Sequence, residues 1–268
     1  MNKFMLILSF TIIFCPSLFA ATLTLNTIPY VCKAGATPQL CNSSMTTDSK
    51  GNVQVHGSQV FTSSGSWTAP AGITVAWVTL QGGGGGGGTR GNDGQNWCSW
   101  SAAGGGSGAL VYHFPILVTP GNSYTVTVGA AGVGGYGNAG QGGSAGGGTY
   151  FGSFYVNGGA GGPGGWPHNQ PGGAGGAGNT LPPTGVSGGA QGMTFGYAGS
   201  QGQSASANVG GTGAGSFFGA GGVGSSSSPP KAATGYGAGG GGFSYNNCND
   251  STSYYGGNGS PGLAIVEW

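Results

Sequence analysis

Charged residues are almost absent from this chain. Only 3% of its 268 residues are Asp, Glu, Lys or Arg, and the formal net charge is +1 at pH 7. A nucleic-acid-binding surface needs clustered Lys and Arg to neutralise phosphates, and a polybasic membrane contact needs them to attract anionic lipids. Both classes of partner are therefore excluded, and recognition must use aromatic, amide and hydroxyl groups.

Catalytic groups are also scarce. The chain has three histidines and four acidic residues, and no two acids lie close enough in sequence to suggest an acid/base pair. No G-x-S-x-G or G-x-G-x-x-G run joins a predicted strand to a helix. Zinc sites need close pairs of Cys or His, whereas His56, His113 and His168 are scattered. We expect no enzyme activity, no cofactor and no metal, and interpret His113 as a packed strand residue.

Long apolar runs are missing after the first twenty residues. At the start, Lys3 precedes an apolar run over 5–15, and small residues follow up to Ala20. This pattern is typical of a secretory signal peptide cleaved near Ala20. The run is too short to span a bilayer, which takes about 18 apolar residues or more. The sequence therefore predicts a secreted or cell-surface protein without membrane insertion.

Cysteines are few, and their number is even once the signal peptide is removed. Cys32, Cys41, Cys98 and Cys248 remain. An even count in a secreted chain indicates disulfides, and four cysteines allow three pairings. We favour a local bond between Cys32 and Cys41 and a long-range bond between Cys98 and Cys248. In the chain-entropy model, a bond that closes so long a loop contributes about 4–5 kcal/mol.

Glycine is abundant where the other residue types are scarce. The chain has 67 glycines, and only five of them precede Gln81. Glycine loses more backbone entropy on folding than any other residue, so such a segment is either disordered or needs close approach of backbones. Disordered linkers rarely carry aromatics, yet this chain has 12 Phe, 11 Tyr and 6 Trp residues. Collagen is excluded because no Gly-X-Y register persists.

The remaining interpretation is a bundle of helices of the polyproline-II type. Such helices have three residues per turn and no internal hydrogen bonds, so neighbouring helices must satisfy their backbone groups. The run Gly82–Gly88 has no side chain on any edge and suits a helix surrounded on all sides. Gly104–Gly106, Gly172–Gly178 and Gly239–Gly242 suit flanking positions.

Strand-like segments lie on both sides of the glycine runs. They are β-branched or aromatic and bounded by turn residues, and they comprise 74–80, 109–114, 123–128, 153–156 and 263–268. The segment 74–80 is apolar on both faces and predicts a covered strand. The predicted fold is mainly β, a β-sandwich with an inserted bundle of polyglycine-II helices and almost no α-helix after the signal peptide. The predicted parts are the signal peptide at 1–20, a small disulfide-linked segment at 21–57 and a glycine-rich domain at 58–268.

Three ordered motifs carry a family resemblance over about 58–268. They are 66–81 followed by polyglycine, 118–132 and the ending 262–268. Together they resemble a glycine-rich domain of bacteriophage tail-fibre and tip-adhesin proteins. The resemblance implies stacked polyglycine helices that present variable loops at their end. Phage tail proteins assemble in the cytoplasm and need no secretion signal, so the signal peptide points to an exported, cell-encoded relative.

Two loops differ most from the glycine runs and supply the candidate binding residues. Joining Cys98 to Cys248 would gather their aromatic, amide and acidic side chains into one surface. The candidate ligand-binding residues are Trp97, Trp100, Tyr245, Asn247, Asp250, Tyr254 and Tyr255. Rigid aromatics beside amides suit recognition of a surface glycan or a protein receptor.

Two other interpretations of this chain remain open. The aromatic rings can cap the bundle edge without binding anything, and the whole protein can serve as a stiff spacer in an extracellular matrix. We predict a non-enzymatic recognition or adhesion protein, and the sequence makes no prediction of its oligomeric state.

Overall fold

The protein divides into two compact units, Met1–Ser58 with Trp268, and Gln59–Glu267. The computed structural model describes residues 56–90, 101–137, 140–165, 209–226, 229–244 and 253–268, and the backbone of strands 45–47, 53–55 and 196–197. In the first unit, β1 (Met45–Thr47) pairs antiparallel with β2 (Val53–Val55). The described residues contain no helix and all named strand pairs are antiparallel, which confirms the prediction of a mainly β fold.

A five-stranded sheet in the order β11-β6-β5-β15-β3 organises the second unit. Its strands are β3 (Ser58–Phe61), β5 (Val75–Gln81), β6 (Leu110–Leu117), β11 (Gly196–Tyr197) and β15 (Leu263–Glu267). One face of β5 carries Ala76, Val78 and Leu80, which are fully buried. The interpretation of 74–80 as a strand covered on both faces holds toward its end, where Thr79 on the other face is buried, and fails at Trp77, which is 40% exposed.

A four-stranded sheet in the order β10-β9-β7-β4 supplies the other part of the apolar core. Its strands are β4 (Gly65–Thr68), β7 (Ser123–Thr127), β9 (Thr149–Phe151) and β10 (Phe154–Val156). Phe154 stacks on Phe114 of the five-stranded sheet, with ring centroids 5.1 Å apart. Trp67 packs on Phe151 inside the four-stranded sheet, with centroids 5.8 Å apart. Aromatic contacts therefore connect the strands within and between the two sheets.

The glycine run that follows β5 makes backbone hydrogen bonds with a period of three residues. The N–H groups of Gly82, Gly85 and Gly88 donate to carbonyls of the segment 101–109. Those of Gly83, Gly86 and Thr89 donate to the segment 141–147, and those of Gly84 and Gly87 donate to 257–260. Successive amides thus turn to three different neighbours, as a backbone with three residues per turn would arrange them.

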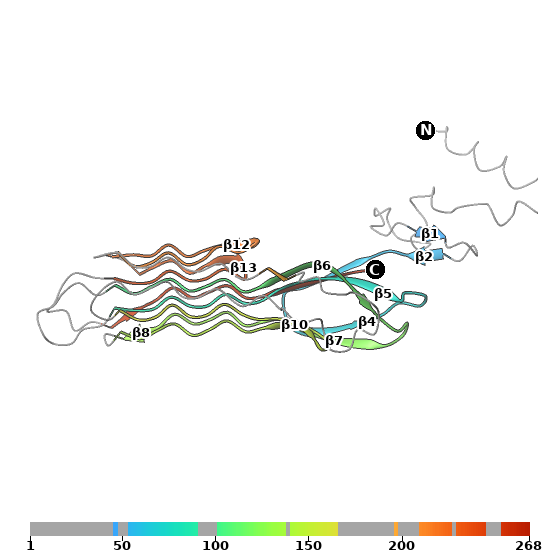
Figure 1. Ribbon diagram of the computed structural model, residues 1–268, viewed down its shortest axis with the longest axis horizontal. Helices are drawn as coiled ribbons and strands as arrows, with labels where there is room; N and C mark the ends of the chain where they lie inside the picture. Colours follow the sequence, from blue (N-terminus) through green and yellow to red (C-terminus); the bar gives the residue numbers. More distant parts are fainter. Residues whose placement is uncertain are drawn as a thin grey trace, which may run out of the picture. The chain divides into compact units, whose positions relative to one another are not determined.

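The carbonyls of the same run reach three further segments. Those of Gly83, Gly86 and Thr89 accept from 159–165, those of Gly84 and Gly87 from 132–135, and those of Gly85 and Gly88 from 240–243. Six backbone segments therefore surround this run, and every residue from Gln81 to Arg90 is buried. Figure 1 shows the described glycine-rich segments as wavy traces that run side by side away from the two sheets.

Close backbone approach explains why the run consists of glycine. A Cβ built on any residue from Gly82 to Gly88 would overlap a backbone carbonyl of a neighbouring segment. The predicted flanking runs at 104–106 and 239–242 are buried as well, and 172–178 lies outside the described residues. Short strand pairs complete the described part, namely β8 (Tyr136–Gly137) with β14 (Tyr254–Tyr255), and β12 (Phe218–Ala220) with β13 (Thr234–Tyr236).

Hydrogen exchange should report how firmly the central run is held. We expect the amides from Gly83 to Thr89 to exchange only through global unfolding, on the order of 10³-fold slower than in an unfolded chain. Each of these amides is buried and hydrogen-bonded. Exchange followed by mass spectrometry on the native protein would measure this protection, with the exposed turn at Ala71 and Gly72 as the fast-exchanging reference. Equally fast exchange in both places would contradict the hydrogen-bonding pattern.

Candidate functional site

The predicted binding loops lie largely outside the described residues, but their bases do not. Trp97, Trp100, Tyr245, Asn247 and Asp250 fall outside them, as do all four cysteines of the predicted disulfides, Cys32, Cys41, Cys98 and Cys248. Ser101, which follows the first loop, forms an antiparallel bridge with Ser244, which precedes the second. Their buried Oγ atoms lie 2.9 Å apart. The two predicted loops therefore extend from neighbouring points of the backbone.

The end of the glycine-rich segments that carries the two loop bases is here termed the tip. It comprises Arg90, Ser101, Ser244, Tyr254 and the residues that contact them. Tyr254 is packed against its neighbours there. The Tyr254 ring stacks on buried Phe243, with centroids 4.5 Å apart and an interplanar angle of 22°. The guanidinium of Arg90 lies 5.3 Å from the centre of the Tyr254 ring, and Arg90 is buried. A desolvated cation–π contact of this kind stabilises by about 2 kcal/mol. Tyr254 therefore anchors the tip as well as bordering the second loop.

Tyr255 and Tyr136 form an exposed aromatic pair at the same end. They lie opposite each other in the β8–β14 pair, and their rings stack with centroids 4.4 Å apart. Both side chains are more than half exposed, at 60% for Tyr255 and 55% for Tyr136. The side-chain hydrogen bond with Tyr136 raises the pKa of Tyr255 above its ordinary value. The phenol of Tyr255 therefore stays neutral near pH 7, and the hydroxyls of both residues can donate and accept hydrogen bonds.

The structure adds residues to the site that the sequence did not indicate. Tyr136 lies 118 positions before Tyr254 in the sequence and is isolated among glycines, so no local pattern predicts that it pairs with the second loop. Arg90 directly precedes the first undescribed loop, and Phe243 directly precedes Ser244 at the base of the second. The sequence offered one signal for Arg90. It is the single arginine of a nearly uncharged chain and directly precedes the first polar loop, and an isolated cation of this kind needs an interaction partner.

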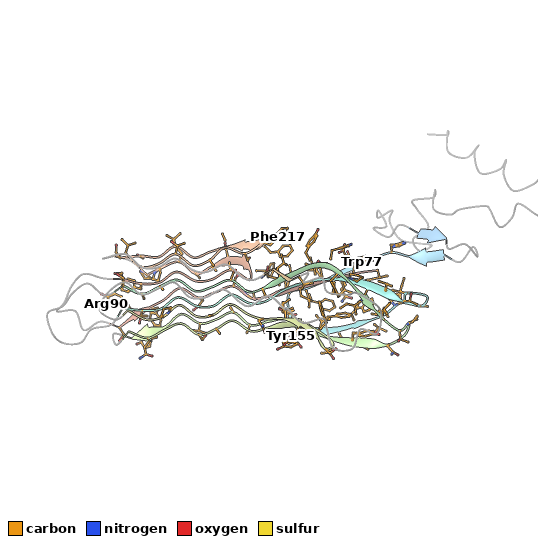
Figure 2. The ribbon with its side chains drawn as sticks, in the orientation of Figure 1. Trp77, Arg90, Tyr155 and Phe217 are labelled. Carbon is orange, nitrogen blue, oxygen red and sulfur yellow. The ribbon has the colours of Figure 1, made fainter. Side chains whose placement is uncertain are left out.

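The exposed rings at the tip offer two kinds of contact surface. Stacked phenols offer flat apolar faces, and their hydroxyls offer neutral hydrogen-bonding groups. Figure 2 places Arg90 at one end of the side-by-side traces and Trp77 at the sheets. Within the described ranges, no three His, Cys, Asp or Glu side chains gather into a group that could hold a metal ion. The same ranges contain no helix long and apolar enough to cross a membrane.

Comparisons with known proteins identify a domain family. No curated protein matches the chain at a significant level. The model of a glycine-rich domain family matches residues 59–268, which covers the two sheets, the glycine runs and the tip. Because that match extends over most of the chain, this protein belongs to the glycine-rich domain family.

Proposed function

We propose that the glycine-rich domain is a rigid support built from a β-sandwich and a bundle of polyglycine-II helices. Two observations support the bundle. The hydrogen bonds of the central run repeat every three residues and reach six neighbours, and a Cβ on any of its glycines would overlap a neighbouring backbone. The stack of Phe114 on Phe154 between the two sheets supports the sandwich. A support of this kind holds its end in one position and so reduces the entropy lost on binding.

We further propose that the protein is a secreted or surface-exposed, non-enzymatic adhesion protein. In this proposal the tip binds a surface glycan or a protein receptor through the loops that contain Trp97, Trp100, Tyr245, Asn247 and Asp250, together with Tyr254 and Tyr255. The bridge between Ser101 and Ser244 carries the proposal, because it brings the bases of both loops together beside exposed rings. Aromatic side chains dominate binding energy in recognition surfaces of this composition.

The proposed disulfide between Cys98 and Cys248 fits the positions of the loop bases. Cys98 lies three residues before Ser101, and Cys248 lies four residues after Ser244, so both are nearly the same chain length from the paired serines. Continuing the register of the serine bridge would place Cys98 opposite position 247, next to Cys248, and a disulfide spans Cα atoms about 4.4–6.8 Å apart. Peptide mapping of the unreduced protein tests this bond, and a pairing of Cys98 with Cys32 or Cys41 would contradict it.

Tyr136→Ala with Tyr255→Ala is the variant that tests the tip. We expect this double variant to bind glycan arrays and receptor-bearing cells at least about tenfold more weakly than the wild type, which corresponds to about 1.4 kcal/mol. Both rings are exposed, so their loss should change the melting temperature little. The measurement is binding of the labelled full chain to an array and to a panel of intact bacterial and eukaryotic cells.

A second stacked tyrosine pair provides the control, with Tyr150 exposed and Tyr155 half-buried. Tyr150 and Tyr155 stack with centroids 5.2 Å apart on β9 and β10, at the sheets and away from the tip. The double variant Tyr150→Ala with Tyr155→Ala should bind like the wild type. Equal loss in both double variants would argue against a tip site. Absence of binding by the wild-type protein to every array and cell would favour the alternative of a stiff matrix spacer.

A further inference from the structure

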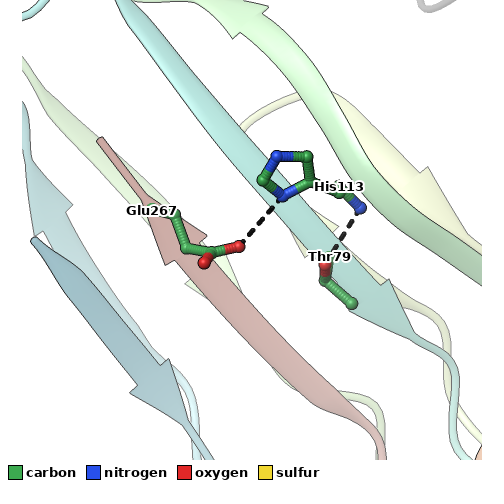
Figure 3. A network of polar contacts seen from close by, with 3 residues as sticks. All are labelled: Thr79, His113 and Glu267. Carbon is green, nitrogen blue, oxygen red and sulfur yellow. Dashed lines mark hydrogen bonds and ion pairs between the residues drawn. The ribbon is translucent and has the colours of Figure 1, made fainter.

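A β-bulge between β5 and β6 exposes two consecutive side chains on the five-stranded sheet. Val78 lies opposite Phe114, and the next pair is Leu80 with Val111, so Tyr112 and His113 together oppose the single residue Thr79. The backbone N–H of His113 donates to Oγ1 of Thr79 at 3.0 Å (Figure 3). His113 has φ +49°, and it is the one non-glycine residue with positive φ in the described part of the chain. The bulge therefore turns both Tyr112 and His113 toward solvent.

The two exposed side chains join a continuous series of rings, here termed the aromatic row. The row comprises Trp77, His113, Tyr112 and Phe217. The rings of Trp77 and His113 are stacked nearly parallel, with centroids 4.7 Å apart and an interplanar angle of 14°. Tyr112 continues the series at 6.1 Å from His113, and Phe217 follows at 5.7 Å from Tyr112. These residues come from β5, β6 and the position before β12, so strands far apart in the sequence build one platform.

The aromatic row contributes little to the core. Trp77, Tyr112 and Phe217 are 40%, 56% and 69% exposed. A positive φ is unfavourable for a residue with a Cβ, and strained residues of this kind concentrate at functional sites. Several large rings exposed side by side are also characteristic of a binding surface. The bulge thus keeps His113 in an unfavourable backbone conformation and holds exposed rings together, although the core does not need these rings.

A polar pair lies directly beside the row. Nδ1 of His113 is 3.2 Å from Oε2 of Glu267 on β15, and both side chains are nearly half exposed (Figure 3). The pair fixes the plane of the imidazole, so the ring that stacks on Trp77 keeps one orientation. It also leaves a carboxylate oxygen and a second ring nitrogen to accept or donate hydrogen bonds. Flat apolar faces and fixed hydrogen-bonding groups therefore lie next to each other.

We propose that the aromatic row is a binding site for a neutral polysaccharide. Pyranose rings present C–H groups on their faces, which fit the negative faces of aromatic rings, and they carry hydroxyls at their edges. The row supplies exposed aromatic surface on Trp77, Tyr112 and Phe217, and the His113–Glu267 pair beside it supplies groups for the hydroxyls. A charged partner finds little complement here, because charged residues make up only 3% of the chain.

This site is separate from the tip. Figure 2 labels Trp77 and Phe217 near the sheets and Arg90 at the opposite end of the side-by-side traces. The proposal therefore does not depend on the function proposed for the tip loops. A protein with both sites would hold a polysaccharide layer at the sheets while its tip faces a receptor.

Binding to polysaccharides tests the proposal on the full chain. The probes are suspensions of cellulose, chitin and starch, and gels that contain soluble β-1,3-glucan or mannan. We expect the wild type to bind at least one of them and Trp77→Ala to bind it at least tenfold more weakly. Trp77→Phe, which keeps an aromatic face, should recover part of the affinity. The double variant Tyr150→Ala with Tyr155→Ala, on the four-stranded sheet, should bind the polysaccharide like the wild type.

His113→Gly separates binding from folding. Glycine adopts a positive φ without strain, so this variant should melt within about 3 °C of the wild type. It lacks the imidazole and should still lose polysaccharide binding at least tenfold. Wild-type protein that binds none of the five probes would overturn the proposal, as would Trp77→Ala and His113→Gly that bind normally. A dimer that Trp77→Ala dissociates, without polysaccharide binding, would assign the row to contact between two copies of the chain instead.

Discussion

Gly85→Ala should destabilise the protein by about 3 kcal/mol or more, a large effect for the addition of one methyl group. A Cβ at this position would overlap the carbonyl group of Ala160 in a neighbouring segment. Gly85 also donates to the carbonyl of Gly106 and accepts from the N–H of Gly240, so moving it strains bonds to two further segments. Each lost backbone hydrogen bond adds about 1 kcal/mol.

The surroundings of Gly85 explain why relaxation cannot relieve this overlap. A flexible side chain can rotate away from a new methyl group, but the atoms around Gly85 belong to backbones that are themselves hydrogen-bonded on several sides. Separating the segments enough to admit a methyl group would lengthen several hydrogen bonds at once. Gly85→Val should therefore be worse than Gly85→Ala and should prevent folding in most conditions.

Gly215→Ala is the matched control for this prediction. Gly215 is exposed, and a Cβ there would meet a single backbone atom at 3.7 Å, which is ordinary contact. The substitution should be neutral or stabilise by up to about 1 kcal/mol, because alanine restricts the unfolded chain. Denaturant titration of both variants, followed by far-ultraviolet circular dichroism, measures the difference. Equal midpoints would show that the central run can open to admit a side chain.

The sequence predicts the glycine-rich segments better than it predicts the sites. Seven consecutive glycines leave no edge that bears a side chain, so the burial of Gly82–Gly88 follows from composition and backbone geometry. The strands at 75–81, 110–117 and 263–267 follow in the same way from their β-branched and aromatic residues. Each of these inferences uses only neighbouring residues, which is why local patterns suffice.

Contacts between distant segments could not be predicted in this way. The stack of Tyr136 on Tyr255 depends on which segments become neighbours, and no periodicity encodes that choice. The bulge at Tyr112 and His113 shifts the register by one residue and exposes a histidine that the alternation predicts to be packed. Trp77 illustrates the same limit, because its strand is apolar on both faces and is buried on both faces at 78–81, yet Trp77 is 40% exposed.

Trp67→Ala should reduce the free energy of unfolding by about 3–5 kcal/mol and the melting temperature by about 10 °C. Trp67 is 1% exposed and lies on β4 opposite Tyr124. Its ring contacts those of Tyr124 and Phe151, with centroids 6.0 and 5.8 Å apart. Removing the indole leaves a cavity between residues of three strands, and the sheets can fill it only by shifting their hydrogen-bonded backbones.

Trp77→Ala removes the same side chain from a strand of the other sheet and should cost about 1 kcal/mol or less. Its indole stacks on one face with His113 and leaves 40% of its surface in solvent, so it loses one ring contact and creates no buried cavity. Calorimetric melting of the two variants beside the wild type compares a core tryptophan with a surface one. If Trp77→Ala destabilised as much as Trp67→Ala, the aromatic row would be part of the core. Strong destabilisation by Trp67→Ala alone would show that the indole of Trp77 is not needed for the fold, and its role would then depend on the polysaccharide-binding test.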